Sequence, residues 1–160
     1  AWRLPLGPLR EPLARLNEVD AIVCNGEVDA RLLRSTPISG MKLLPGEFYR
    51  LGDPAQTCTA DALRGKTLHA LAGIGDPQRF FRTLASLGLE SVNHPFPDHH
   101  AYTQEDLCFA KDGILLMTEK DAVKCSALSL GETWVLPVEA ELAQALIDLV
   151  LEKLRGRQIA

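Results

Sequence analysis

The feature that most constrains the fold is an apolar run at residues 67–72, TLHALA, which is followed by the turn GIGDP and then by PQRFFRTLASLG. The last segment places its apolar residues at helical spacing. An apolar run between turns is typical of a strand buried on both faces, and such strands occur in parallel sheets covered by helices. The order strand, turn, helix therefore predicts an α/β fold.

Other segments continue this alternation. Pro12 marks the first position of a short predicted helix at 13–18, which leads into an apolar strand at 19–24. Three more strands and two more helices are expected, the strands at 89–97, 114–117 and 133–138 and the helices at 103–110 and 140–154. The predicted fold is a mostly parallel, Rossmann-like sheet with helices on both faces.

Three details refine this prediction. Two strand-like pieces around Pro45-Gly46, within residues 41–52, predict a short β-ribbon or hairpin, and residues 53–65 are expected to form a loop. Thr103 and Asp106 predict a capping box. The last helix has an apolar stripe that we expect to face the core, formed by Leu142, Leu146, Leu149, Val150 and Leu154.

The composition excludes several classes of protein. The chain has 160 residues, 46% of them hydrophobic, which suits one domain with its own core. A net charge of −4 argues against binding to nucleic acid. The four cysteines form no C-x-x-C pair, and no apolar stretch reaches about 18 residues. We therefore expect reduced thiols, no metal site, no membrane span and a soluble chain.

Two glycine-containing turns partly match phosphate-binding loops. Gly65-Lys66-Thr67 has the end of a Walker A loop, but Ala60 stands where the first glycine belongs, and the segment precedes a strand. Gly73-Ile74-Gly75 does lie between a strand and a helix, but Gln78 replaces the third glycine of a dinucleotide fingerprint. Asp76 is expected to cap this helix and occupy its N–H groups. We predict a loop at the first turn and a structural turn at the second, with anion binding as its alternative.

The segment HPFPDHHAY contains His94, His99 and His100 beside Asp98. Acid/base chemistry needs one imidazole and an orienting carboxylate, which this loop supplies. Adjacent histidines usually point apart, which argues against a metal site. Histidines in a loop at the carboxyl end of a sheet favour a functional role over core packing.

Polar residues also follow the predicted strand at 114–117, where open α/β sheets bind ligands. They are Thr118, Glu119, Lys120, Asp121 and Lys124 of the segment MTEKDAVK. The alternative is a solvated helical turn. Arg10 and Glu11 precede the first helix, either as a surface pair or as groups suited to phosphate oxygens and to a metal-bound water.

Six segments together resemble one family. They are GPLREP (7–12), VDAIVCNG (19–26), LHALAGIGDPQRFF (68–81), FPDHHAYTQEDL (96–107), LMTEKDAVK (116–124) and WVLPVEAEL (134–142). In this order they are similar to the carboxyl-terminal part of the tetraacyldisaccharide 4′-kinase family of Gram-negative bacteria. The resemblance covers nearly the whole chain, and it is specific as a set.

The resemblance implies a kinase that uses Mg²⁺ with ATP to phosphorylate the 4′-hydroxyl of a lipid disaccharide in lipid A biosynthesis. The family's Walker A loop, its acidic catalytic residues and its membrane-contacting helix precede GPLREP. We therefore expect this chain to be a carboxyl-terminal portion that is inactive alone. The expected partners are ATP and the lipid acceptor, at the cytoplasmic face of the inner membrane.

The resemblance also implies roles for particular residues. His99 matches a histidine expected to face the acidic base across a cleft, with Asp98 beside it, while His100 packs or caps locally. Arg10 and Glu11 match the end of the nucleotide-side segment. The residues of MTEKDAVK belong to a family motif without an assigned role. The expected lobes are residues 1–40 on the nucleotide side, a connector at 41–52 and a carboxyl-terminal lobe at 53–160.

The alternative to the kinase is a function of another class. In this alternative the chain is a non-catalytic, Rossmann-like module that binds a small anion or nucleotide at the turn GIGDP. A Walker A loop upstream of Ala1 in the natural protein favours the kinase, whereas a natural start near Ala1 favours the module.

Overall fold

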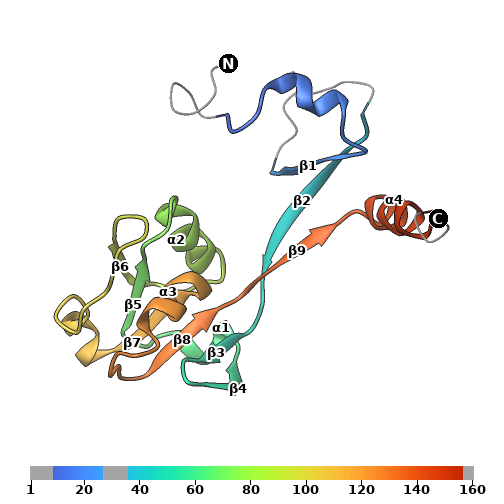
Figure 1. Ribbon diagram of the computed structural model, residues 1–160. Helices are drawn as coiled ribbons and strands as arrows, with labels where there is room; N and C mark the ends of the chain where they lie inside the picture. The colour runs from blue at the N-terminus through green and yellow to red at the C-terminus, as the bar shows by residue number, and fades with distance from the viewer. Residues whose placement is uncertain (1–8, 27–35, 157–160) are drawn as a thin grey trace. The chain divides into compact units, whose positions relative to one another are not determined.

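The computed structural model describes residues 9–26 and 36–156 (Figure 1). The chain divides into two compact units, one formed by residues 45–139 and the other by residues 1–44 with 140–160. In this grouping the carboxyl-terminal segment joins the amino-terminal residues, and residues 41–52, the expected connector, are divided between the two units. The lobe boundaries themselves stay a prediction.

The unit of residues 45–139 is built on a six-stranded sheet. Its strands are Phe48–Arg50 (β3), Asp53–Cys58 (β4), Leu68–Ala72 (β5), Val92–Pro95 (β6), Ile114–Thr118 (β7) and Thr133–Leu136 (β8). Their order is β4-β3-β8-β7-β5-β6. The four strands from β8 to β6 are parallel to their neighbours, whereas β3 is antiparallel to both β8 and β4. The predicted α/β class and mostly parallel sheet are confirmed.

Helices cover both faces of this sheet, as predicted (Figure 1). Side chains alternate along β5, so that Ala70 faces one core and Leu71 the other. The first core is completed by α1 (Ala60–Leu63) and α2 (Pro77–Ser86), and the second by α3 (Glu119–Cys125). This double covering explains why β5 and β7 are apolar along almost their whole length.

Both glycine-containing turns form as predicted. Gly65-Lys66-Thr67 lies between α1 and β5, with a φ of +72° at Gly65, and opens no helix. After β5, Asp76 is the N-cap of α2, and its Oδ1 accepts a hydrogen bond from the Arg79 N–H at 3.2 Å. Pro77 occupies the first helical turn, where its missing N–H costs nothing.

The hairpin expected at Pro45-Gly46 is wrong. A strand at Ile38–Pro45 (β2) pairs with Ile22–Asn25 (β1) in a separate three-stranded sheet, so β2 and β3 belong to different sheets. Pro45 has no N–H for a strand ladder, and the Gly46 N–H donates to the Pro137 carbonyl at 3.0 Å. The two strand-like pieces therefore do not pair with each other.

The antiparallel connection lies further along the chain. Leu51 and Gly52 join β3 to β4, with a φ of +87° at Gly52 that glycine adopts easily. The predicted loop at 53–65 is therefore wrong over β4, and it is also wrong over α1. Residues 53–57 are all exposed, so they lack the apolar alternation that identifies a strand.

The described residues of the other unit form a small sheet and two helices. A 3₁₀ helix at Leu13–Asn17 precedes β1, with Pro12 as its N-cap instead of its first residue. The sheet has the order β1-β2-β9, where β9 is Val138–Leu142. A helix at Gln144–Arg155 (α4) follows.

The helix predicted at 140–154 begins later than expected, because residues up to Leu142 belong to β9 and α4 starts at Gln144. The sequence VEAEL alternates apolar and acidic residues, which is the period of a strand. No residue of α4 is buried, so the prediction that its apolar stripe faces the core is also wrong within the described residues. Its exposed apolar residues are Ile147, Val150, Leu151 and Leu154.

Two histidines link β5 to the edge strand β6. His69 Nδ1 and His94 Nε2 lie 3.0 Å apart, and the His94 ring stacks on Phe109 with ring centres 3.6 Å apart. Burial lowers the pKa of His94, and a charge on His69 lowers it further. His94 is thus a packed histidine of the sheet and lies apart from the loop that follows it.

We expect the chain to lose stability on mild acidification. Because the folded pKa of His94 lies below the unfolded value of about 6.5, the unfolded chain binds a proton first, and the free energy of unfolding falls from about pH 7 toward pH 5. Denaturant unfolding at several pH values should show a smaller decrease in the His94→Gln variant. An equal decrease in both proteins would contradict this role of His94.

Candidate functional site

The carboxyl ends of three adjacent parallel strands meet at one edge of the six-stranded sheet. The strands are β7, β5 and β6. They lead into α3, into the turn that begins at Gly73 and into residues 96–102, respectively. Open α/β sheets bind ligands at such an edge.

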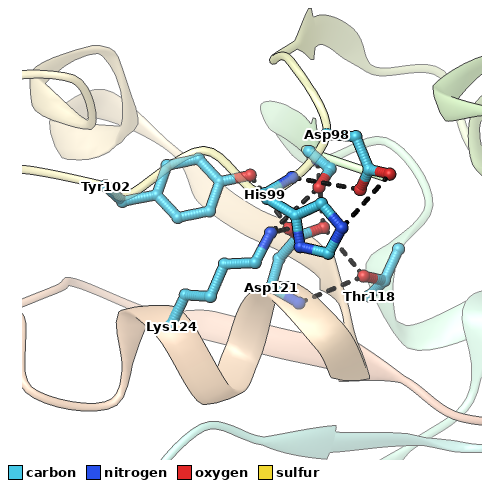
Figure 2. A network of polar contacts seen from close by, with 7 residues as sticks. Asp98, His99, Tyr102, Thr118, Asp121 and Lys124 are labelled. Carbon is cyan, nitrogen blue, oxygen red and sulfur yellow. Dashed lines mark hydrogen bonds and ion pairs between the residues drawn. The ribbon is translucent and has the colours of Figure 1, made fainter. Parts of the chain in front are cut away.

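The Asp121 carboxylate is fully buried at this edge (Figure 2). Its Oδ1 accepts hydrogen bonds from the Tyr102 hydroxyl at 2.9 Å and from Lys124 Nζ at 3.1 Å. Its Oδ2 accepts from the Thr118 hydroxyl at 2.8 Å and from the Gly73 N–H at 3.2 Å. A buried charge is tolerated when it is paired and hydrogen-bonded, and here each oxygen has two donors.

Lys124 extends this cluster to the backbone. Its Nζ donates to the Gly73 carbonyl at 2.9 Å and lies 5.5 Å from the centre of the Tyr102 ring. Burial and the Asp121 carboxylate raise the pKa of Tyr102, which keeps its hydroxyl a donor. Burial also raises the pKa of the Cys125 thiol, to about 11, with Asp121 as the second cause.

Gly73 leaves no room for a side chain. A Cβ at this position would collide with the Tyr102 hydroxyl and lie 3.3 Å from Asp121 Oδ1. The Gly73 N–H is already bonded to Asp121. The glycine is therefore required by the packing of Tyr102, which supports the interpretation of GIGDP as a structural turn.

Asp98 and His99 lie on an exposed turn after β6 (Figure 2). His99 has a φ of +61°, and its N–H donates to Asp98 Oδ1 at 3.0 Å. The distance between His99 Nε2 and Asp98 Oδ2 is 3.6 Å, and the His99 side chain is 91% exposed. The imidazole is accessible to a ligand at this edge, with a carboxylate beside it.

His100 makes different contacts from its neighbour. Its Nε2 lies 3.2 Å from Asp106 Oδ2, and its ring packs against Phe96 and Tyr102. Its side chain is 28% exposed. The adjacent imidazoles therefore lie in distinct surroundings, one exposed and one packed.

The capping contact predicted at Thr103 and Asp106 is present. The Thr103 N–H donates to Asp106 Oδ2 at 2.9 Å, and the Asp106 N–H donates to Thr103 Oγ1 at 3.3 Å. The Thr103 N–H and then His100 lower the pKa of Asp106. The helix expected at 103–110 is wrong, because a turn is followed there by a 3₁₀ helix at Cys108–Asp112.

The other predicted site residues lie elsewhere. Glu119 and Lys120 are exposed, and Glu119 Oε2 accepts from the Val138 N–H at 3.4 Å. Arg10 and Glu11 are exposed residues of the other unit, where Glu11 lies 3.2 Å from Arg15. The structure thus brings Thr118, Asp121 and Lys124 of the motif MTEKDAVK into one cluster and leaves Glu119 and Lys120 outside it.

Two members of the cluster, Gly73 and Tyr102, are not among the residues that the sequence predicts for the site. Tyr102 closes the motif FPDHHAY, and a buried tyrosine hydroxyl usually needs a hydrogen-bond partner. That rule is the signal by which Tyr102 could be connected to a polar residue of another motif. Nothing in the sequence identifies Asp121 as that residue.

Neither a metal-binding cluster nor a membrane-spanning helix is found among the described residues. Among them, no group of three or more His, Cys, Asp or Glu side chains is arranged to hold a metal ion. No helix there is both long and apolar enough to cross a membrane. The cysteines are free thiols: Cys24, Cys58, Cys108 and Cys125.

Comparison with known protein families shows to which family this chain belongs. A family model described as LpxK, tetraacyldisaccharide-1-P 4′-kinase, matches residues 1–155. The chain belongs to this family. The resemblance predicted from the sequence motifs is confirmed.

Curated relatives in the LpxK family include two proteins named tetraacyldisaccharide 4′-kinase, from Dechloromonas aromatica and Methylobacillus flagellatus. They are 62% and 48% identical to this chain over 160 and 154 residues. The alignments cover 99% and 94% of this chain but 48% and 44% of the relatives. The chain therefore spans about half the length of these LpxK proteins.

A solved LpxK structure has a similar fold. It is the crystal structure of the "apo" form of LpxK from Aquifex aeolicus in complex with ATP, with a TM-score of 0.65 and 26% sequence identity. The match covers 94% of this chain and 47% of that chain.

We expect Gly73→Ala to destabilise the chain by about 1–3 kcal/mol, because the new methyl group must displace the Tyr102 hydroxyl. Gly131→Ala is the matched control, since a Cβ there meets no atom within 4 Å. Urea unfolding of both variants measures the difference. Equal stability of the two variants would show that Tyr102 does not fill the space beside Gly73.

Proposed function

We propose that the whole protein, of which this chain is the carboxyl-terminal portion, transfers a phosphoryl group from ATP to the 4′-hydroxyl of tetraacyldisaccharide 1-phosphate. This reaction belongs to lipid A biosynthesis. The family match over residues 1–155 supports the proposal. Its structural support is the exposed Asp98–His99 turn at the edge of the sheet where the parallel strands end, the edge at which open α/β sheets bind ligands.

His99 is the residue of this chain that we assign to the chemistry. The acceptor oxygen attacks the γ-phosphorus of ATP, the bond to the leaving ADP oxygen breaks, and the hydroxyl proton passes to a base. The acidic base belongs to the rest of the protein. The His99 imidazole, with the Asp98 carboxylate beside it, is assigned to hold or share a proton with that base. Such assistance contributes roughly 10²- to 10⁴-fold to the rate.

ATP is bound mainly by the other half of the protein. The family implies a divalent metal, Mg²⁺, which screens the phosphate charges when bound. Its ligands are assigned to the rest of the protein, together with the Walker A loop that the family implies there. Arg10 and Glu11 are assigned to the nucleotide side. The chain alone, without a Walker A loop, is expected to be inactive.

The acceptor determines where the whole protein works. A lipid disaccharide and ATP meet at the cytoplasmic face of the bacterial inner membrane, and the rest of the protein makes the membrane contact. The second candidate function, an anion-binding module, receives less support. The Gly73 N–H donates to Asp121 and the Arg79 N–H donates to Asp76, so these donors are already engaged.

We expect His99→Ala in the full-length kinase to lower kcat at least about tenfold, with little change in the KM for ATP. The reason is that His99 acts on the proton of the acceptor and not on nucleotide binding. His100→Ala is the control, and its effect should be milder because His100 contacts Asp106 instead. Initial rates with ATP and tetraacyldisaccharide 1-phosphate measure both variants. The reverse ranking, or a change mainly in the KM for ATP, would refute the role of His99.

A further inference from the structure

The loop that carries His99 is anchored at both ends. At one end the Phe96 N–H donates to the Ala72 carbonyl, the last residue of β5, at 2.8 Å. At the other end the Tyr102 hydroxyl donates to the buried Asp121 carboxylate at 2.9 Å. Residues 96–102 are thus held between the end of β5 and the start of α3.

The turn between these anchors has a conformation that needs support. His99 has a φ of +61°, a region that non-glycine residues adopt at a cost. The His100 N–H donates to the Pro97 carbonyl at 3.1 Å and closes the turn. With its side chain 91% exposed, His99 is little constrained by packing, so its position depends on the backbone around it.

Lys124 fixes the adjacent turn against the same carboxylate. Its Nζ bridges the Gly73 carbonyl at 2.9 Å and Asp121 Oδ1 at 3.1 Å. The turn after Gly73 also lies beside the His99 loop, because a Cβ at Gly75 would lie 3.7 Å from Asp98 Oδ2. One buried carboxylate therefore sets the positions of both loops at the edge of the sheet.

We propose that Tyr102, Asp121 and Lys124 are positioning residues that hold His99 in place for phosphoryl transfer. They act through the loop of residues 96–102 and touch no reacting atom. This proposal rests on the proposed function of His99, and it gives Asp121 and Lys124 of the motif MTEKDAVK a role. Displacing a reacting group by about 1 Å can cost up to 10²-fold in rate, so a loosened anchor has a kinetic effect.

The test uses Tyr102→Phe in the full-length kinase, because this change removes the hydroxyl and keeps the ring in the core. We expect kcat to fall by roughly tenfold with the KM for ATP unchanged. In the His99→Ala background the same change should alter kcat less than about twofold, because the network acts through His99. Lys124→Met should behave in the same way.

Matched controls separate positioning from stability. Tyr49→Phe removes the other tyrosine hydroxyl of the chain, on β3, and Lys111→Met removes an exposed lysine charge. Both should keep the wild-type kcat. If Tyr102→Phe lowers the melting temperature but leaves kcat unchanged, or if its effect on kcat is undiminished in the His99→Ala background, the network is only structural and the proposal is wrong.

A second readout does not depend on the role of His99. Hydrogen exchange of the His100 amide, which bonds to the Pro97 carbonyl, reports the order of the turn. Exchange should be faster in Tyr102→Phe than in wild type or Tyr49→Phe. If His99→Ala leaves kcat unchanged while this exchange accelerates, the proposed function fails and the anchoring of the loop stands. Unchanged exchange in Tyr102→Phe overturns the anchoring itself.

Discussion

The hydrogen bonds to the buried Asp121 carboxylate hold together the edge of the sheet that carries the candidate site. An isolated charge in this position would be strongly unfavourable, so its four donors must stay in place together. They come from the turn after β5, the loop after β6, the end of β7 and helix α3. Tyr102 excludes any side chain at Gly73, so this packing constrains the sequence of two loops at once.

This arrangement separates a buried support from an exposed imidazole. The support is buried and fully hydrogen-bonded, whereas the His99 imidazole is exposed to a ligand. A histidine that exchanges protons must be reachable, yet its position has to be set by groups that do not move. Under the proposed function, what this chain supplies to the reaction is one oriented imidazole.

Much of the fold follows from local signals. The apolar runs of β5 and β7 and the Asp76-Pro77 start of α2 are each determined within a few residues, and the structure confirms them. β4 could not be predicted because its residues are exposed. The partner of β2 could not be predicted because pairing depends on distant strands. Asp98 and His99 are adjacent in the sequence, whereas Tyr102 and Asp121 meet only in the folded chain.

Hydrogen exchange at the Gly73 amide tests the central role of Asp121 most directly. In the wild-type chain this amide should exchange as slowly as the amides within β5, because its N–H is buried against Asp121 Oδ2. Asp121→Asn should accelerate exchange of the Gly73 amide by a much larger factor than exchange of the Ala70 amide in β5. If the Gly73 amide of the wild-type chain exchanges as fast as an exposed turn amide, the carboxylate does not hold these loops together.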